Sequence, residues 1–393
     1  MYKKAIIHMD LDTFFVSCER LINPKLENKP VLIGGTNDRG VVASCSYEAR
    51  KFGVHAAMPM RLAKRLCSDA IIIRGDSSLY SKYSNMVTDI IKDRAPMYEK
   101  ASIDEFYIDM TGMERFHGCH QWAKELRQKI IKETNLPISF GLSANKTVSK
   151  IGTGEAKPNG QIQIPRGTEK PFLSPLSVRK IPMVGEKTYE LLRSLGVGYI
   201  KTIQEMPIEM LQRVLGKHGT SLWKKAQGLD KTPVIPYQEQ KSISIERTFD
   251  RDTADMTKLN NIMLAMAENL AFQLRNRNKL TSCVTVKIRY ADFNTHSKQA
   301  RIPYTACDHT LIEKTKDLFN GLYKRRLLIR LIGVKYSHLV GGGHQVNMFE
   351  DTEDIINLYT AMDHIRKRFG QNAIKRACAI GSKTIVRIKP FNG

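Results

Sequence analysis

Ile6-Ile7-His8-Met9-Asp10-Leu11-Asp12-Thr13-Phe14-Phe15 is a short apolar run that carries two aspartates just before a pair of phenylalanines. A second run of this kind is Ala101-Ser102-Ile103-Asp104-Glu105-Phe106-Tyr107-Ile108-Asp109. Side chains alternate between the two faces of a β-strand, so a strand would place Asp10 and Asp12 on one face. Because a buried unpaired carboxylate is costly, both runs suggest a compensating cation. Carboxylate oxygens suit Mg²⁺, which keeps other sites for water and phosphates.

The two acidic runs together suggest a site for two Mg²⁺ ions, a pattern that nucleases and cyclases share. Two such ions about 4 Å apart can activate an attacking hydroxyl and stabilise a leaving pyrophosphate. Asp10, Asp104 and Glu105 are the carboxylates that fit this role. Adjacent residues of a regular strand face opposite ways, so Asp104 and Glu105 can both reach the metals only at a turn, which Ser102 favours. The remaining acids are expected to be structural: Asp12 and Asp109.

The overall charge points to a polyanionic partner. Among 393 residues, 62 Lys and Arg stand against 39 Asp and Glu, which gives a net charge of +23. Nucleic acid is the commonest partner for such a chain, whereas a membrane is not expected, because no apolar run approaches the ~20 residues of a spanning helix. We expect no signal peptide, and scattered cysteines without a C-x-x-C pair fit reduced thiols in the cytoplasm.

The order of predicted elements indicates an α+β multidomain chain. If residues 18–77 are set aside, strands and helices alternate as β, α, β, β, α, β up to residue 143. This order is typical of the split βαβ, or ferredoxin-like, arrangement. It would bring the strand of Asp10 beside the hairpin that carries Asp104 and Glu105. Residues 18–77 are then an inserted subdomain.

Beyond residue 165 the pattern changes twice. Two glycine turns between helices predict helix–hairpin–helix units, whose backbone N–H groups can bind phosphates without reading sequence; plain helical hairpins are the alternative. Residues 229–241 form a linker, and residues 241–339 a small α/β unit rich in Arg and Lys. A tail with a helix at 353–369 follows. The DNA contacts expected at the hairpins are Gly185, Lys187, Gly216, Lys217 and Gly219.

A third group of residues could bind a triphosphate. Ser44, Tyr47 and Arg50 are spaced at i, i+3 and i+6, so on a helix or its entry they share a face. A hydroxyl, a phenol and a bidentate guanidinium together suit phosphate oxygens. Lys157, on a turn after a helix, supplies a second cation. Taken alone, the first three residues would be explained better by a solvated helix face with a surface arginine.

Taken in order, these segments resemble the Y-family translesion DNA polymerases of the bacterial DNA polymerase IV type. The resemblance runs from residue 4 to about residue 340. It implies a ferredoxin-like palm, an inserted fingers domain, a helix–hairpin–helix thumb and an α/β little finger. The motifs that carry it are residues 7–15, 46–54, 102–105, 156–160 and 241–248. The implied bounds are 1–17 with 78–165 for the palm, 18–77 for the fingers, 166–232 for the thumb, 233–240 for the linker, 241–340 for the little finger and 341–393 for the tail.

The resemblance also implies residue roles. Asp10, Asp104 and Glu105 would be catalytic and bind two Mg²⁺ ions, with the main-chain carbonyl of Leu11 assisting. Phe15 would be the steric gate that excludes ribonucleotides. Met183 departs from the family, which usually has glycine there. The residues implied to contact the nucleotide are Phe14, Phe15, Ser44, Tyr47, Arg50 and Lys157.

The tail carries a separate motif. Gln345-Val346-Asn347-Met348-Phe349 resembles the bacterial sliding-clamp-binding pentapeptide, with Gln345, Met348 and Phe349 as its anchors. A strand or loop packed on the little finger is the alternative. The implied partners are therefore primer–template DNA, dNTPs and a bacterial sliding clamp.

The function expected from these observations is template-directed, error-prone DNA synthesis by a cytoplasmic monomer, in translesion synthesis and damage tolerance. A non-catalytic DNA-binding scaffold is the second hypothesis, although a scaffold needs no metal ligands. A metal-dependent nuclease is the third, although a nuclease needs neither a triphosphate clamp nor a steric gate.

Overall fold

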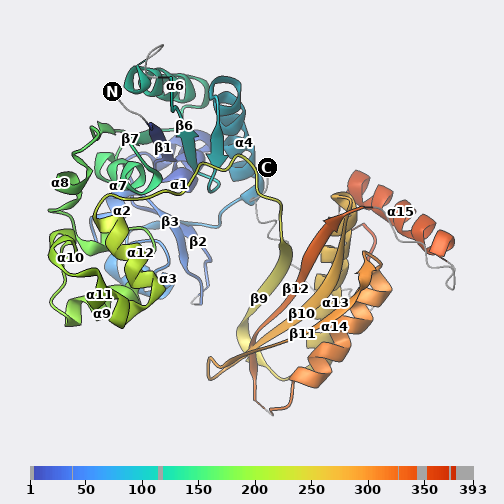
Figure 1. Ribbon diagram of the computed structural model, residues 1–393. Coiled ribbons are helices and arrows are strands. Elements are labelled where there is room, and N and C mark those ends of the chain that lie inside the picture. Colours follow the sequence, from blue (N-terminus) through green and yellow to red (C-terminus); the bar gives the residue numbers. More distant parts are fainter. Residues whose placement is uncertain are drawn as a thin grey trace. The chain divides into compact units, whose positions relative to one another are not determined.

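The computed structural model describes residues 4–37, 39–113, 118–325, 327–342, 352–370 and 373–377. The chain divides into two compact units, the first ending at Gln238 and the second beginning at Glu239 (Figure 1). Each unit has its own hydrophobic core. Among the described residues, no helix is both long enough and apolar enough to cross a membrane.

A five-stranded sheet forms the centre of the first unit. Its strand order is β5-β6-β1-β7-β8, with neighbours antiparallel except for β7 and β8. β1 lies between β6 and β7, and its apolar side chains are buried on both faces. This order confirms the predicted split βαβ arrangement. The strands are β1 (Ile6–Leu11), β5 (Tyr98–Lys100), β6 (Glu105–Asp109), β7 (Ile138–Ser143) and β8 (Gln161–Gln163).

Helices cover this sheet. Three of them share a core with β1, β6 and β7: α1 (Phe14–Ile22), α4 (Ser77–Arg94) and α6 (Cys119–Thr134). A fourth, α7 (Lys146–Ala156), lies directly against β7 and β1. Glycine permits this close approach, because a Cβ atom on Gly141 would lie 2.4 Å from the carbonyl oxygen of Ser149.

Residues 18–77 contain a small subdomain with a core of its own, although Cys18, Val31 and Ile33 pack into the core of the five-stranded sheet. Its sheet order is β3-β2-β4, with β2 and β4 parallel. The elements are η1 (Pro24–Leu26), β2 (Val31–Gly34), β3 (Val42–Cys45), α2 (Tyr47–Arg50), α3 (Met60–Leu66) and β4 (Ile71–Ile73).

A helical region follows the sheet in the chain. Its core includes apolar residues of α7 as well as its own helices. Gly216, with φ of 58°, joins α11 to α12 in a tight turn. The elements are α8 (Glu169–Leu173), η2 (Val178–Lys180), α9 (Glu186–Ser194), α10 (Ile200–Glu205), α11 (Ile208–Leu215) and α12 (Lys217–Ala226).

Residues 228–235, which follow α12, are tied to the sheet. Asp230 accepts hydrogen bonds from the backbone N–H and the hydroxyl of Thr147 at 3.2 and 2.7 Å. Glu99 accepts one from the backbone N–H of Ile235 at 2.8 Å and pairs with Lys146 at 2.7 Å. Val234 is buried beside these contacts. The first half of the linker is therefore fixed to the first unit.

The second unit is an antiparallel sheet backed by helices. Its strand order is β11-β10-β12-β9, and α13 (Met256–Asn276) and α14 (Asp308–Leu322) share one core with it (Figure 1). Side chains alternate along β10, where Val284, Val286 and Ile288 are buried and the residues between them are partly exposed. The strands are β9 (Ser242–Thr253), β10 (Lys279–Tyr290), β11 (Thr295–Thr305) and β12 (Ile329–Gly341).

A terminal helix, α15 (Thr352–Phe369), is held to the second unit by buried charges. Arg275 pairs with Asp308 and with Asp363 of α15, each at 2.6 Å. Tyr359, also on α15, lies under the same guanidinium at 4.7 Å. The helix predicted at 353–369 is therefore present and packs on α13 and α14 through polar groups.

Met183 adopts a backbone conformation that favours glycine. Its φ is +80°, and its side chain is 75% exposed at the tip of the hairpin before α9. The left-handed region costs an L-residue roughly 1–2 kcal/mol, which glycine does not pay. Met183, which stands where the family usually has glycine, thus adopts the same turn but lowers the stability of the fold.

We expect Met183→Gly to stabilise the helical region by about 1 kcal/mol, because glycine relieves this strain and little buried surface is lost. Thermal unfolding of the purified variant measures the effect. Val184→Gly, one residue on at a position without positive φ, is the matched control and should lower the midpoint. Equal losses in both variants would contradict the assignment of strain to Met183.

Candidate active site

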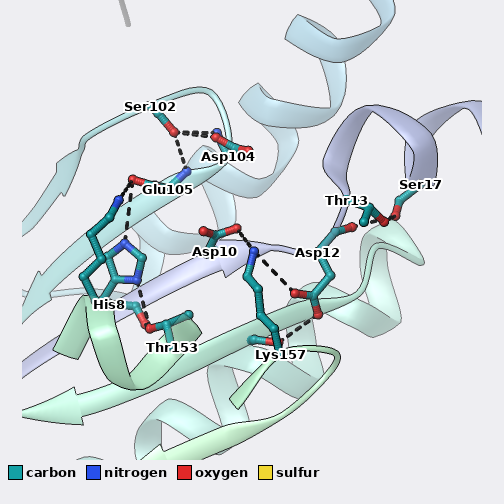
Figure 2. A network of polar contacts seen from close by, with 12 residues as sticks. His8, Asp10, Asp12, Thr13, Ser17, Ser102, Asp104, Glu105, Thr153 and Lys157 are labelled. Atoms are coloured by element: carbon teal, nitrogen blue, oxygen red, sulfur yellow. Dashed lines mark hydrogen bonds and ion pairs between the residues drawn. The ribbon is translucent and has the colours of Figure 1, made fainter. Parts of the chain in front are cut away.

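Strand pairing brings the two predicted acidic runs together. Asp10 on β1 lies directly opposite Glu105 on β6, and the backbone N–H of Leu11 donates to the carbonyl of Asp104 at 3.0 Å. Directly opposed residues of an antiparallel pair point to the same face. All three predicted metal ligands, Asp10, Asp104 and Glu105, therefore gather at one end of the sheet (Figure 2).

A turn lets two adjacent acids serve one site. Asp104 immediately precedes β6, and the hydroxyl oxygen of Ser102 accepts from the backbone N–H groups of Asp104 and Glu105 at 3.3 and 3.0 Å. The Ser102 hydroxyl in turn donates to the Asp104 carboxylate at 2.5 Å. Asp104 thus stands outside the regular alternation of β6, as predicted.

Lysines from α7 neutralise these carboxylates. Lys150 Nζ lies 2.5 Å from the Glu105 carboxylate, and Lys157, just after α7, pairs with Asp10 and lies 3.5 Å from Asp12. Sequence reasoning assigned Lys157 to the triphosphate alone and missed Lys150. The available signal was spacing, since Lys146 and Lys150 stand at i and i+4 on one face of α7.

Asp12 and His8 support the site from beneath. Asp12 accepts hydrogen bonds from the Ser139 hydroxyl at 2.8 Å and the Asn159 backbone N–H at 2.6 Å, which fits its predicted structural role. The His8 ring lies 2.9 Å from the Thr153 hydroxyl and 3.8 Å from Glu105 (Figure 2). Burial lowers the pKa of His8 to about 4, so its ring is neutral at pH 7.

Burial and charge shift the carboxyl groups in different directions. Burial raises the pKa of Asp10 to about 7 despite its pairing with Lys157, and burial also raises the pKa of Asp104. For Glu105, burial alone would raise the pKa, but contacts with His8 and Lys150 outweigh it and lower the pKa. Of these two partners, Lys150 carries a full positive charge, 2.5 Å from the carboxylate. Three crowded carboxylates therefore need positive charge.

The donor set suits a hard divalent cation. Within the described ranges, no three His, Cys, Asp or Glu side chains are grouped as a ready-made metal site. The available ligands are nonetheless all oxygens, as Mg²⁺ prefers. One buried oxygen of Asp12 also has no hydrogen-bond partner among the described residues. The residues present thus fit a divalent metal ion, which would compete with Lys150 and Lys157 for the carboxylate oxygens of Glu105 and Asp10.

Two of the predicted triphosphate residues, Tyr47 and Lys157, lie beside the acids. The Tyr47 hydroxyl is buried without a hydrogen-bond partner in the described part of the chain. Burial and the Asp12 charge raise the pKa of Tyr47, so the hydroxyl stays protonated and can donate. The Arg50 guanidinium lies 5.0 Å from the Tyr47 ring centre, and Ser44 lies on β3 just before α2.

The two phenylalanines after the first acidic run differ in exposure. Phe15 is partly buried and stacks on Tyr80 with ring centres 4.4 Å apart. Phe14 is only 2% exposed and belongs to the core of the sheet. Phe15 therefore has surface left for a ligand. A direct nucleotide contact of Phe14 would need surface that the core already covers.

One predicted DNA contact needs correction. Gly185, Lys187, Gly216 and Lys217 are exposed, so their surfaces are accessible. Gly219 is buried inside α12, where a Cβ atom would lie 2.1 Å from the carbonyl oxygen of Leu211. Its glycine allows α12 to pack on α11 and cannot contact a phosphate. The clamp residues Gln345, Met348 and Phe349 lie outside the described residues.

Comparisons with known proteins identify the family. Residues 9–154 match the impB/mucB/samB family, residues 240–348 match its C-terminal domain, and residues 179–230 match the thumb domain of DNA polymerase-iota. A DNA polymerase IV from Dehalococcoides mccartyi is 38% identical over 376 residues, covering 95% of this chain and 96% of that protein. The chain belongs to the Y-family DNA polymerases. A Treponema denticola DNA polymerase IV is 34% identical over 381 residues, with the same coverage of both chains.

Solved structures agree with this membership. The Y-family DNA polymerase chimera Dbh-Dpo4(243-245)-Dbh has a TM-score of 0.75 at 27% identity, covering 86% of this chain and all of that one. DinB from Sulfolobus solfataricus has a TM-score of 0.61 at the same identity and coverage. The resemblance drawn from the sequence and the multidomain α+β fold are thereby confirmed. The chain is a DNA-directed DNA polymerase of the translesion type.

We expect divalent cations to bind more weakly as the pH falls below about 7. The pKa of Asp10 is raised to about 7, so below that pH a cation must displace a proton from this carboxyl group. Mn²⁺ affinity should fall up to about tenfold between pH 7 and pH 6 and change little between pH 8 and pH 9. Titration of the purified protein with Mn²⁺ under electron paramagnetic resonance measures this. Equal affinity at pH 6 and pH 8 would contradict the raised pKa.

Proposed function

We propose that Asp10, Asp104 and Glu105 bind two Mg²⁺ ions, with the main-chain carbonyl of Leu11 assisting, during template-directed DNA synthesis. The observation that carries this proposal is the register that sets Asp10 opposite Glu105, with Asp104 in the adjoining turn. When bound, the metals supply activation of the primer 3′-hydroxyl and neutralisation of the leaving pyrophosphate. The chain's part is to hold three carboxylates together at one end of a rigid sheet.

The triphosphate of an incoming dNTP would be held by Ser44, Tyr47, Arg50 and Lys157. Support comes from the Tyr47 hydroxyl, a buried donor without a partner among the described residues. The Arg50 guanidinium, held close to the Tyr47 ring, adds a charged donor of bidentate geometry. The two groups lie in the inserted subdomain, which fits fingers at residues 18–77.

Phe15 would select the sugar. Its ring is stacked against Tyr80 and cannot easily swing aside. A flat ring against C2′ leaves no room for a 2′-hydroxyl, so ribonucleotides would be excluded. Since Phe14 is buried in the core, we assign it to holding Phe15 in place, with the two ring centres 5.6 Å apart.

Primer–template DNA would be held by phosphate contacts. The exposed hairpin residues Gly185, Lys187, Gly216 and Lys217 offer backbone N–H groups and cations. The net charge of +23 favours sequence-independent, salt-dependent binding. The proposal also includes the predicted bounds of the palm, fingers, thumb, linker and little finger.

Two further parts of the proposal rest on sequence. A bacterial sliding clamp would take Gln345, Met348 and Phe349, and such tethering would raise the local concentration of enzyme at the primer end. The enzyme would act as a cytoplasmic monomer. A non-catalytic scaffold remains the competing function. Crowded carboxylates argue against it, as does the buried Tyr47 hydroxyl, which has no hydrogen-bond partner within the described ranges.

Asp104→Asn should abolish primer extension and leave the fold intact. A metal site is worth several kcal/mol of transition-state stabilisation, so we expect a loss of more than about 100-fold in rate. Extension of a primed template with Mg²⁺ and dNTPs measures it. Asp109→Asn, an acid at the far end of β6, is the matched control and should extend normally. If neither the wild type nor Asp104→Asn extends while both bind DNA, the scaffold function takes precedence.

Phe15→Ala should admit ribonucleotides. Removal of the ring opens space for a 2′-hydroxyl, so the preference for dNTPs over rNTPs in kcat/KM should fall by about 100-fold or more. Single-nucleotide incorporation with each substrate gives the ratio. Phe52→Ala removes an exposed ring of the inserted subdomain and serves as control. Unchanged sugar selectivity in Phe15→Ala would refute the assignment.

A further inference from the structure

Three lysines lie on α7 or directly after it: Lys146, Lys150 and Lys157. Each of the three pairs with a carboxylate of the sheet: Lys146 with Glu99 at 2.7 Å, Lys150 with Glu105 at 2.5 Å, and Lys157 with Asp10. The first pair lies on β5 beside the linker, whereas the other two occupy the acids assigned to the metals. Helix α7 and the residue directly after it therefore supply two cations to the active site, Lys150 and Lys157.

We propose that Lys150 and Lys157 act as internal counter-ions that occupy the site's carboxylates until a nucleotide arrives, and thereby make the binding of divalent cations depend on the triphosphate. This inference rests on the proposed metal ligands. It adds that the enzyme binds metal weakly on its own and that two lysines cause the weakness.

Competition for the same oxygens is the first step of the argument. Within the described residues, the recorded contacts of Glu105 with Lys150 and with His8 are on the same carboxylate oxygen. Lys157 reaches both Asp10 and Asp12. A divalent cation on these acids would lie within about 6 Å of an ammonium group, where like charges repel strongly in a partly buried site. Each lysine must shift or be tolerated at a cost in metal affinity.

The position of α7 keeps the lysines in place. The helix backbone is packed against β7 at Gly141 and carries Thr153, whose hydroxyl lies 2.9 Å from the His8 ring beside Glu105. Lys150 cannot leave Glu105 by movement of the helix. Lys157 is different, because it follows the helix in extended conformation, with φ −66° and ψ 144°. The Lys157 side chain can therefore turn toward another anion without any movement of the helix.

A bound triphosphate is that anion. If Lys157 moves from Asp10 to the phosphates, the carboxylate becomes available to a metal at the moment when the nucleotide is present. Coupling between two ligands is reciprocal, so the nucleotide raises metal affinity and the metal raises nucleotide affinity by the same factor. Part of this coupling would pass through one side chain, Lys157.

The test measures Mn²⁺ binding to the full chain by electron paramagnetic resonance, without DNA and without turnover. At pH 9, above the raised pKa of Asp10, Lys150→Met and Lys157→Met should each bind Mn²⁺ about tenfold tighter than the wild type, because an opposing charge is removed. Lys146→Met removes the same charge from the same helix face, away from the site, and should match the wild type. Lys150→Arg and Lys157→Arg keep the charge and should also stay close to the wild type.

A non-hydrolysable dNTP analogue completes the test. After subtraction of the Mn²⁺ that free analogue holds, the analogue should tighten binding strongly in the wild type and less in Lys157→Met. Affinities of Lys150→Met and Lys157→Met that equal that of Lys146→Met, or fall below it, would overturn the counter-ion role. If Asp104→Asn binds Mn²⁺ as well as the wild type does, the proposed metal site itself fails. Thermal unfolding of each variant shows that the fold is kept.

Discussion

Antiparallel pairing of β1 with β6 is the constraint on which the rest of the site depends. It sets Asp10 against Glu105, although the two residues are 95 positions apart in the chain. A slip of one residue would turn Asp10 to the opposite face and separate the acids. The register is secured because β1 is paired on both edges and its apolar side chains are buried on both faces. The same apolar residues that stabilise the core therefore fix the catalytic geometry.

A second constraint is the close packing of α7 on the sheet. Gly141 leaves room for the helix backbone, and a Cβ atom on Gly152 would lie 2.6 Å from the Ile164 side chain. The helix thereby brings Lys150 within contact distance of Glu105 and Thr153 within contact distance of His8. Larger side chains at either glycine would push both contacts away. The pairing of Lys150 with Glu105 thus depends on close backbone packing at two glycines, which themselves carry no charge.

Much of this could be predicted from the sequence. Apolar strands and amphipathic helices have distinct periods, so the βαββαβ order and the inserted subdomain followed from pattern alone. Motifs long enough to resemble a family single out the acids, Tyr47, Arg50 and Phe15, whose roles stay predictions. The remaining features depend on which surfaces meet. Lys150 looks like an ordinary exposed helix lysine until β6 is placed beside it, and Gly219 looks like a hairpin contact until Leu211 is placed against it. The buried charges that hold α15 join residues 88 positions apart, which no local pattern can show.

The linker contacts have a consequence for how the two units act together. Glu99 holds Ile235 on one side, and on the other Lys279 holds Glu239 at 2.8 Å. Between these anchors stand only Pro236, Tyr237 and Gln238, a tether that spans about 14 Å at full stretch from Ile235 to Glu239. When one unit releases a polyanion that the other unit still binds, this short tether keeps the released unit nearby. Its effective concentration for rebinding to the polyanion therefore remains high. Retention on a nucleic acid can then exceed what either unit achieves alone, and it comes from the shortness of the connection.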